Sequence, residues 1–148
     1  MTHTIYTDGS CLGNPGKGGW AFIYIHDDGV TSYSGSNPST TNNIMELTAI
    51  IEGLKYISSL PDVQKIEIYS DSKYCIDGIT KWINKWVQNN WKTSSNNKVK
   101  NENLWKELYE YTSNLSVEFH HVKAHNGDKY NTMVDNLAQN AATNCFST

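Results

Sequence analysis

Acidic side chains at four separate positions of this sequence are the groups best suited to chemistry: Asp8, Glu46, Asp71 and Asp135. Asp8 and Asp71 each follow a stretch that alternates like a β-strand. Glu46 is expected in the first turn of a helix, and Asp135 at the entry to the last helix. Strand ends and helix starts meet at one rim of an α/β sheet, so we expect the four carboxylates to lie close together.

Four neighbouring carboxylates predict a site for divalent metal ions. The negative charges repel one another unless cations neutralise them, and Mg²⁺ prefers carboxylates, water and phosphate oxygens. Two such ions about 4 Å apart can activate an attacking water and stabilise the leaving oxygen in phosphodiester hydrolysis. Each carboxylate considered alone has a simpler explanation as a turn, a helix cap, a helix-start charge or a solvated group. The flanking motifs have to decide between these interpretations.

The apolar pattern predicts an α/β domain that holds these carboxylates in place. Three strands come first, and alternating helices and strands follow, which indicates a mixed sheet with helices packed on it. The polar segment 94–103 is expected to be a loop. Strands are predicted at 3–8, from Gly18 to Ile25, at 30–36, 63–70 and 116–122, and helices at 45–57, after Asp71, at 81–88, 101–112 and 134–141.

Length and composition favour one soluble domain over residues 1–148. The longest apolar run falls short of the roughly 20 residues that span a bilayer, which excludes a membrane protein. The N-terminus lacks the pattern of a secretory signal, so we expect a cytoplasmic protein. Three cysteines, Cys11, Cys75 and Cys145, lack metal-ligand spacing and are expected to be reduced thiols.

A polyanionic partner would have to bind a local basic patch, because the net charge of the chain is -3. The segment from Lys81 to Lys106 is the candidate. It contains six lysines against one acidic residue, Glu102, together with four of the five tryptophans.

Four motifs together resemble the type 1 ribonuclease H family over about Thr4 to Ala142. The motifs are TDGSCLGNPG at 7–16, TNNIMEL at 41–47, YSDS at 69–72 and VKAHNG at 122–127. The resemblance implies a five-stranded mixed sheet, with three antiparallel strands and then two parallel ones, and helices on both faces. It also implies a monomeric endonuclease that hydrolyses the RNA strand of RNA/DNA hybrids, leaves 3'-hydroxyl and 5'-phosphate ends, and needs no membrane or obligate protein partner.

The resemblance assigns the metal site residue by residue. Asp8 would bridge two Mg²⁺ ions, with Mn²⁺ as an alternative metal, while Glu46 and Asp71 complete one site and Asp135 the other. His125 stands in the matching Gly-containing motif, where its near-neutral pKa suits a proton-shuttling role. His120 and His121 are interpreted as solvated side chains.

The same resemblance predicts the substrate-binding residues. RNA is distinguished from DNA through its 2'-hydroxyl, and we expect that reading at the backbone around Cys11, at Asn14 and at Glu46. The other predicted contacts are the groove residues Asn42 and Asn43, the phosphate-pocket residues Thr41 and Asn101, and the basic protrusion with Trp82, Trp86 and Lys92.

The chain departs from better-known bacterial members of this family at two basic positions. Val87-Gln88-Asn89-Asn90 replaces a Lys and Arg cluster, and Ser39 stands where an Arg often lies. Lys73 is a charge that those relatives lack, and we expect it to compensate in part. Substrate affinity is therefore expected to be weaker than in relatives with a fully basic protrusion.

Two other functions fit parts of the pattern. A catalytically silent hybrid-binding module would lack the carboxylates, and all four are present here. An integrase-like or resolvase-like DNA nuclease would lack the GNPG and TNN motifs. Magnesium-dependent cleavage of a hybrid, compared with cleavage of duplex DNA, separates these alternatives.

Overall fold

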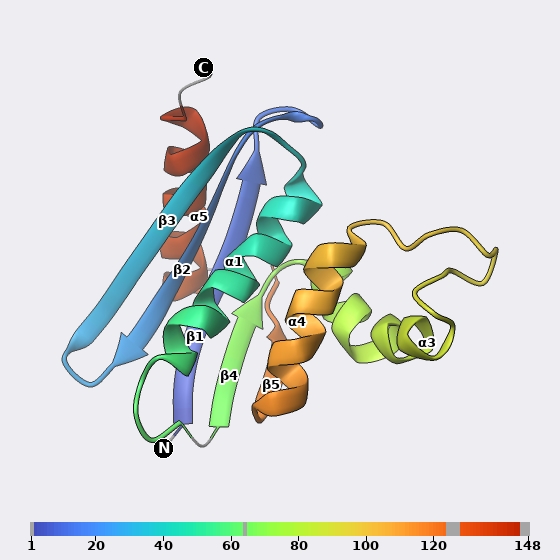
Figure 1. The fold of residues 1–148 in the computed structure, drawn as a ribbon. Coiled ribbons are helices and arrows are strands. Elements are labelled where there is room, and N and C mark those ends of the chain that lie inside the picture. The colour runs from blue at the N-terminus through green and yellow to red at the C-terminus, as the bar shows by residue number, and fades with distance from the viewer. Residues whose placement is uncertain (1, 64, 124–127, 146–148) are drawn as a thin grey trace.

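A computed structural model describes residues 2–63, 65–123 and 128–145 as a five-stranded sheet flanked by helices (Figure 1). The sheet order is β3-β2-β1-β4-β5, with antiparallel pairing among the first three strands and parallel pairing of β1 with β4 and of β4 with β5. The predicted fold class is therefore confirmed. The strands are β1 (Thr2–Cys11), β2 (Gly16–His26), β3 (Gly29–Thr40), β4 (Lys65–Ser70) and β5 (Val117–His121).

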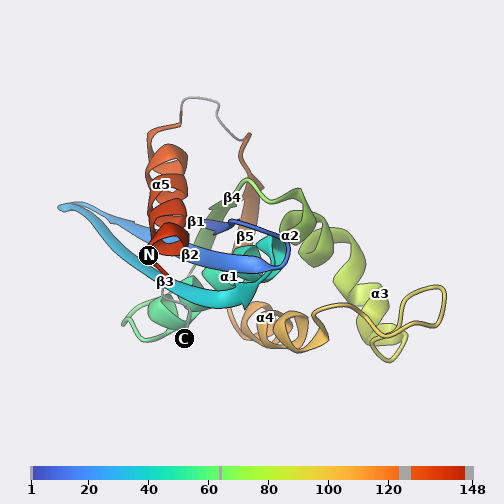
Figure 2. The ribbon, with the colours of Figure 1, turned by 90° about the horizontal axis from the view of Figure 1, so that it is seen from above.

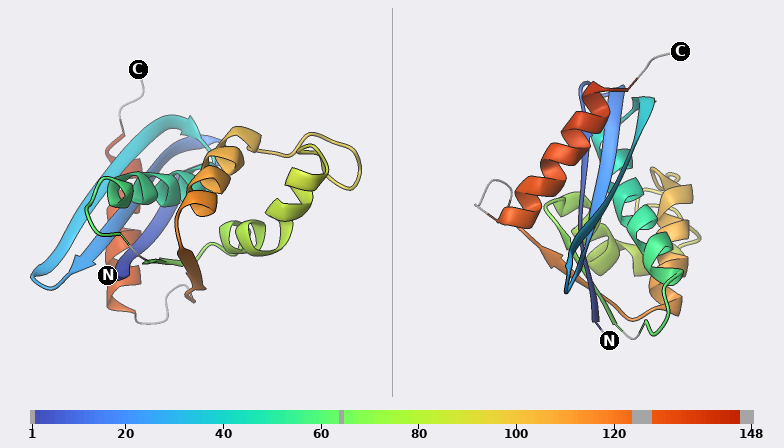
Figure 3. Two further views of the ribbon diagram at one scale, coloured as in Figure 1. Left: turned by 60° about the horizontal axis from the view of Figure 1, so that its bottom comes forward. Right: turned by 90° about the vertical axis from the view of Figure 1, so that its left-hand side faces the viewer.

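Helices cover both faces of the sheet. They are α1 (Asn42–Ser58), α2 (Lys73–Asp77), the π-helical turn η1 (Gly78–Trp82), α3 (Ile83–Gln88), α4 (Glu102–Asn114) and α5 (Lys129–Thr143). On one face α1 packs on β1 and β2, with α4 beside it, and α5 packs on the other face (Figure 3, right). The chain segments that carry the predicted carboxylates therefore come from both layers and from the sheet between them.

Strand alternation divides the core between the two faces. Ile5 and Ile68 are fully buried in the larger cluster with α1 and α4. Tyr6 points the other way and packs with Val134 and Ala138 of α5. Trp105 of α4 is fully buried in the larger cluster.

The segment after Asp71 forms a helical arm that stands beside the sheet (Figure 2). The sequence predicted two separate helices here. In the structure α2, η1 and α3 follow one another directly, with the π-helical turn between the two α-helical parts. Gly78 opens that turn against Trp105, and any β-carbon at Gly78 would overlap the indole. This contact spans residues far apart in the sequence, so local periodicity could not indicate it.

The connections between elements include a tight turn and the predicted loop. Asp27 and Asp28 form the turn between β2 and β3, and Gly29 has the positive φ of 137° that favours glycine. The polar segment 94–103 is a loop for most of its length, although its Val99 is buried and Lys92 forms an isolated β-bridge with Lys98. Over the described ranges, no helix is long and apolar enough to cross a membrane.

Candidate active site

Three of the four predicted carboxylates meet at the end of the parallel strands. Asp8, Glu46 and Asp71 each offer an oxygen, and these oxygens lie within 4.8 Å of one another. Asp8 and Glu46 are only 3% and 6% exposed. The expectation that carboxylates from β1, α1 and the end of β4 gather in one place is therefore confirmed.

The register of the parallel strands sets two of these positions. The β1–β4 pairing ends at Thr7 opposite Ser70, so Asp8 and Asp71 are the next residues along the chain after this pair. The prediction that β1 ends at Asp8 was wrong. Its antiparallel pairing with β2 continues to Cys11 opposite Gly18, because β2 lies on its other side and extends further than β4.

Gly9 joins β1 to α1 at the site. Its backbone N–H donates to Asp8 Oδ1 at 2.9 Å and also to Glu46 Oε1. A β-carbon on Gly9 would overlap the backbone of Met45 and Glu46. Glu46 lies in the second turn of α1 and not in the first as predicted, since the helix begins at Asn42. Only glycine allows the strand and the helix to approach this closely.

Asp135 reaches the cluster from the other face of the sheet. It lies in the second turn of α5, not at its start as predicted, because Asp128 caps that helix by accepting from the backbone N–H groups of Tyr130 and Asn131. Asp135 lies close enough to Asp8 to raise the pKa of Asp8. Gln139 Nε2 donates to both Asp135 oxygens, at 3.2 and 3.1 Å.

The negative charges of the cluster favour binding of a cation. Burial raises the pKa of Asp8 above its ordinary value, and the neighbouring Glu46 and Asp71 raise it further. Burial likewise raises the pKa values of Glu46 and Asp71. The raised pKa values show that the carboxylates are difficult to ionise together in the metal-free protein, because their negative charges repel one another. Hard divalent ions neutralise these charges and prefer oxygen ligands, so they suit this cluster.

Two contacts beside the cluster were not predicted from the sequence. The Ser72 hydroxyl accepts from the Cys75 N–H and lowers the pKa of Glu46 by hydrogen bonding. His121 is exposed, in agreement with its interpretation as a solvated side chain, and its Nε2 also lies 3.3 Å from the Asp71 carbonyl oxygen, where its charge lowers the pKa of Asp71. Pairing of His121 with Ser70 across the parallel strands is the signal that would have placed it here. His125 lies outside the described residues.

The predicted readers of the 2'-hydroxyl and groove surround the start of α1. Thr41 caps the helix by accepting from the Ile44 N–H at 3.3 Å, and Asn42 and Asn43 are exposed in its first turn. Asn14 is exposed between β1 and β2. The Cys11 thiol donates to the carbonyls of Gly13 and Thr40. These contacts give Thr41 and Cys11 structural roles, while their predicted contacts with substrate stay predictions.

The remaining predicted contacts belong to the arm and to the start of α4. Lys73 is exposed at the first position of α2, two residues after Asp71. Trp82 is 37% exposed, whereas Trp86 packs edge-on against Trp105. Two grooves open on this part of the molecule. One, of about 420 Å³, is lined by residues that include Trp82, Trp86 and Lys92, and the other, of about 610 Å³, by residues that include Lys98, Lys100 and Asn101.

Comparison with known proteins agrees with this geometry. The family model described as RNase H matches residues 1–143. A ribonuclease H of Wolbachia pipientis wMel is 51% identical over 137 residues, covering 93% of this chain and 92% of the relative. LC9-RNase H1, a type 1 RNase H with the type 2 active-site motif, has a TM-score of 0.81 at 32% identity, covering 96% of this chain and 72% of its own.

A more distant structure supports the fold alone. LC11-RNase H1, solved in complex with an RNA/DNA hybrid, has a TM-score of 0.72 at 21% identity and covers 95% of this chain and 96% of its own.

Proposed function

The chain belongs to the RNase H family, and on that premise we propose that this enzyme hydrolyses the RNA strand of RNA/DNA hybrids with two Mg²⁺ ions. The products would carry 3'-hydroxyl and 5'-phosphate ends. The observation that carries the proposal is the convergence of Asp8, Glu46 and Asp71 oxygens within 4.8 Å. With Asp135 beside Asp8, these four residues would hold the ions.

Bound ions of this kind supply a nucleophilic water at neutral pH and neutralise charge on the phosphate. The chain's own groups fix the geometry that this chemistry needs. The Gly9 N–H holds the carboxylates of Asp8 and Glu46 relative to each other, and Gln139 orients Asp135. Each contact limits the rotation of an acidic side chain, so the ligands are positioned before substrate arrives.

Substrate selection would come from two surfaces beside the carboxylates. The exposed Asn14 and the start of α1 are available to a 2'-hydroxyl and to the minor groove of a hybrid. Lys73 and the arm groove with Trp82 and Lys92 are available to the DNA strand. The proposed substrate therefore spans the sheet end and the arm.

The direct test compares one labelled RNA/DNA hybrid with duplex RNA, duplex DNA and single strands, with Mg²⁺ and with a chelator. We expect Mg²⁺-dependent cleavage of the RNA strand of the hybrid, with 5'-phosphate products. Binding without cleavage would support the silent-module alternative. Preferential cleavage of duplex DNA would support the DNA-nuclease alternative.

Replacing His125 with Ala should slow turnover without abolishing it. A lost proton-transfer group lowers the rate by roughly 10- to 1,000-fold, and we expect kcat to fall in that range while the Michaelis constant changes little. Steady-state kinetics on the hybrid measure both constants, with His26→Gln as the control. His26 lies at the end of β2, where its ring bonds to Thr31. Unchanged kcat with a large rise in the Michaelis constant would make His125 a binding residue.

Adding a charge at Gln88 should tighten hybrid binding and increase its salt dependence. Gln88 is exposed at the end of α3, whereas Asn89 holds the next turn through the carbonyls of Lys92 and Thr93 and should be kept. Each new phosphate contact steepens the slope of log affinity against log salt by up to about one unit. A salt titration in Ca²⁺, which should bind without supporting cleavage, measures that slope for Gln88→Lys.

The control for this charge is Ser32→Lys, an exposed position on the edge strand β3. It adds the same charge on the side of the sheet away from the arm (Figure 1). Equal slopes for Gln88→Lys, Ser32→Lys and the unmodified enzyme would show that this part of the arm does not contact the hybrid.

A further inference from the structure

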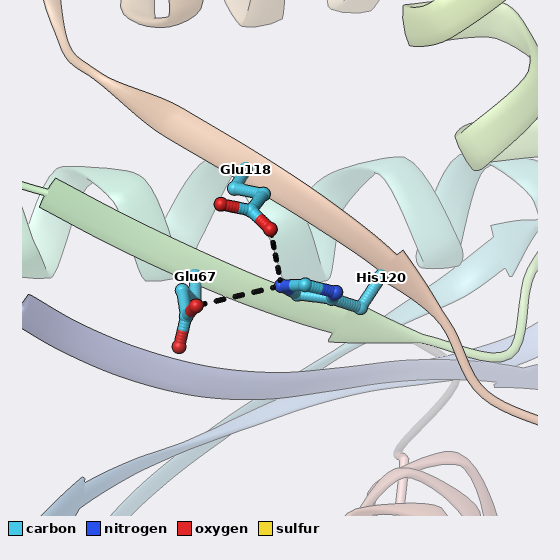
Figure 4. Close-up of side chains that lie close together, drawn as sticks. All are labelled: Glu67, Glu118 and His120. Atoms are coloured by element: carbon cyan, nitrogen blue, oxygen red, sulfur yellow. Dashed lines mark ion pairs between the residues drawn. The ribbon is translucent and has the colours of Figure 1, made fainter.

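A second group of metal-ligating side chains lies on the last two strands, away from the carboxylate cluster. Glu67 of β4 and Glu118 and His120 of β5 each offer one ligand atom, and these atoms lie within 4.8 Å of one another (Figure 4). We propose that these three residues bind a divalent transition-metal ion of the Zn²⁺ class, separate from the ions that support catalysis.

Parallel pairing brings the three side chains together. Glu67 and Glu118 are register partners, and His120 follows Glu118 by two residues, so all three point to the same face of the sheet. His120 stacks on Tyr69 and Tyr69 on Tyr6, which packs against α5, so this is the face on which α5 packs over β1 and β2. The side chains of Glu67, Glu118 and His120 are 26%, 47% and 31% exposed, so the group lies at the protein surface.

The distances between His120 Nε2 and the two carboxylate oxygens suit an ion bound between these atoms better than direct hydrogen bonds. His120 Nε2 lies 3.3 Å from Glu118 Oε1 and 3.6 Å from Glu67 Oε1. Bonds of about 2.0–2.2 Å to a tetrahedral zinc ion separate its ligand atoms by roughly 3.3–3.6 Å. Nε2 is itself buried, yet it makes no hydrogen bond to any group in the described part of the chain. The nitrogen therefore faces the space between the two carboxylates.

Stacking holds the imidazole in this orientation. The His120 ring lies 4.6 Å from the Tyr69 ring with an angle of 17° between their planes. Tyr69 stacks in turn on Tyr6 at 4.6 Å and 10°. The three stacked rings come from β1, β4 and β5. Stacking already restricts rotation of the imidazole, so less freedom is lost when it binds an ion.

A lysine beside the cluster competes with the ion. Lys65 Nζ lies 2.7 Å from Glu118 Oε2 and leaves Oε1 facing His120. Removal of Lys65 should therefore tighten metal binding. In the alternative arrangement, a protonated His120 pairs with both carboxylates and no ion binds, and removal of Lys65 would not create a metal site.

The position of the site separates it from catalysis and suggests a stabilising effect. Glu67 precedes Asp71 by four residues, which is about 13 Å along a strand. An ion held by Glu67 of β4 and by Glu118 and His120 of β5 would join the edge strand to its neighbour. Because such an ion binds the folded chain, it should raise the temperature of unfolding.

The experiment is a titration of Zn²⁺ and of Co²⁺ in excess Mg²⁺, which occupies the carboxylate cluster. Calorimetry and thermal unfolding follow Zn²⁺, and the visible absorption of tetrahedral Co²⁺ reports its geometry. We expect one ion per chain with a tetrahedral spectrum. His120→Gln should weaken binding at least about 100-fold, more than loss of a residue that only supports a ligand. His26→Gln should bind as the unmodified protein does, and Lys65→Met should bind about threefold more tightly.

Two further variants test the metal site independently of His120→Gln. If His120→Gln does not fold, Glu67→Gln removes another ligand and should also weaken binding. Asp8→Asn should keep Zn²⁺ binding, because it alters only the carboxylate cluster. Equal affinity in the unmodified protein and in the folded ligand variants would overturn the proposal. Loss of Zn²⁺ binding in Asp8→Asn, or a Co²⁺ spectrum without tetrahedral bands, would also overturn it.

Discussion

Asp8→Asn is expected to lower the turnover of RNA/DNA hybrid to less than about a hundredth of the value for the unmodified enzyme. This is a loss of over roughly 3 kcal/mol in transition-state stabilisation. Asp8 offers an oxygen within 4.8 Å of oxygens of Glu46 and Asp71 and also interacts with Asp135, so it would be a ligand of the proposed ions. The amide keeps the shape of the residue and removes its charge. Single-turnover kinetics at saturating hybrid measure the effect.

The exposed turn residue Asp28 provides the control for this amide substitution. Asp28→Asn makes the same chemical change away from the cluster and should leave turnover unchanged. More than about a hundredth of the original turnover in Asp8→Asn would remove Asp8 from the metal site.

The same substitution should stabilise the metal-free protein at neutral pH. The pKa of Asp8 is raised by burial and by Glu46, so the folded chain holds a proton that the unfolded chain releases above about pH 4. Folded protein that binds more protons than unfolded protein loses stability as pH rises. Asp8→Asn removes this penalty, and we expect a gain of about 1–3 kcal/mol at pH 7 with a flatter pH dependence.

Urea unfolding between pH 5 and pH 8 in a chelator measures this difference. Asp28→Asn is again the control and should follow the unmodified protein. A metal-free Asp8→Asn protein less stable than its parent would show that the Gly9 hydrogen bond outweighs the repulsion among the carboxylates.

The sequence was sufficient to predict the carboxylate cluster because its members follow local rules. Asp71 follows a strongly alternating strand, and Glu46 lies near a helix start that Thr41 caps. Parallel strands bring such ends together whatever their length. The order of strands and helices predicted a mixed sheet with helices packed on it, and the family resemblance implied three antiparallel strands followed by two parallel ones.

The features that were missed depend on pairing between distant segments. Periodicity places a side chain on one face of a strand but does not give the register between strands. The contacts of His120 and His121 could not be predicted because nothing local indicates that β5 pairs with β4. That pairing brings His121 to Asp71 and His120 to Glu67. The π-helical turn at Gly78 was missed for the same reason, since its partner is Trp105 of α4.

Gly9→Ala should reduce hybrid cleavage by at least about 100-fold, although no metal ligand is changed. The new methyl group would overlap the backbone of Met45 and Glu46, and backbone cannot rotate aside as a flexible side chain can. The strand β1 and the helix α1 must then separate, and Glu46 moves with the helix. A displacement of about 1 Å at a catalytic group costs roughly 10²-fold in rate. Crowding of this kind should also destabilise the fold by about 1–3 kcal/mol.

Gly53→Ala is the matched control for this steric effect, because Gly53 lies on the same helix and also faces β1. Its added methyl group would meet the end of the flexible Ile5 side chain and not the backbone. We expect nearly unchanged turnover, since Ile5 can adjust and alanine favours the helix. The measurement is kcat as a function of Mg²⁺ concentration, together with urea unfolding. If displacement of Glu46 weakens the metal site, Gly9→Ala should require more Mg²⁺ for half-maximal rate, whereas Gly53→Ala should not. Full turnover in Gly9→Ala at the ordinary Mg²⁺ requirement would show that catalysis does not depend on the close approach of β1 and α1.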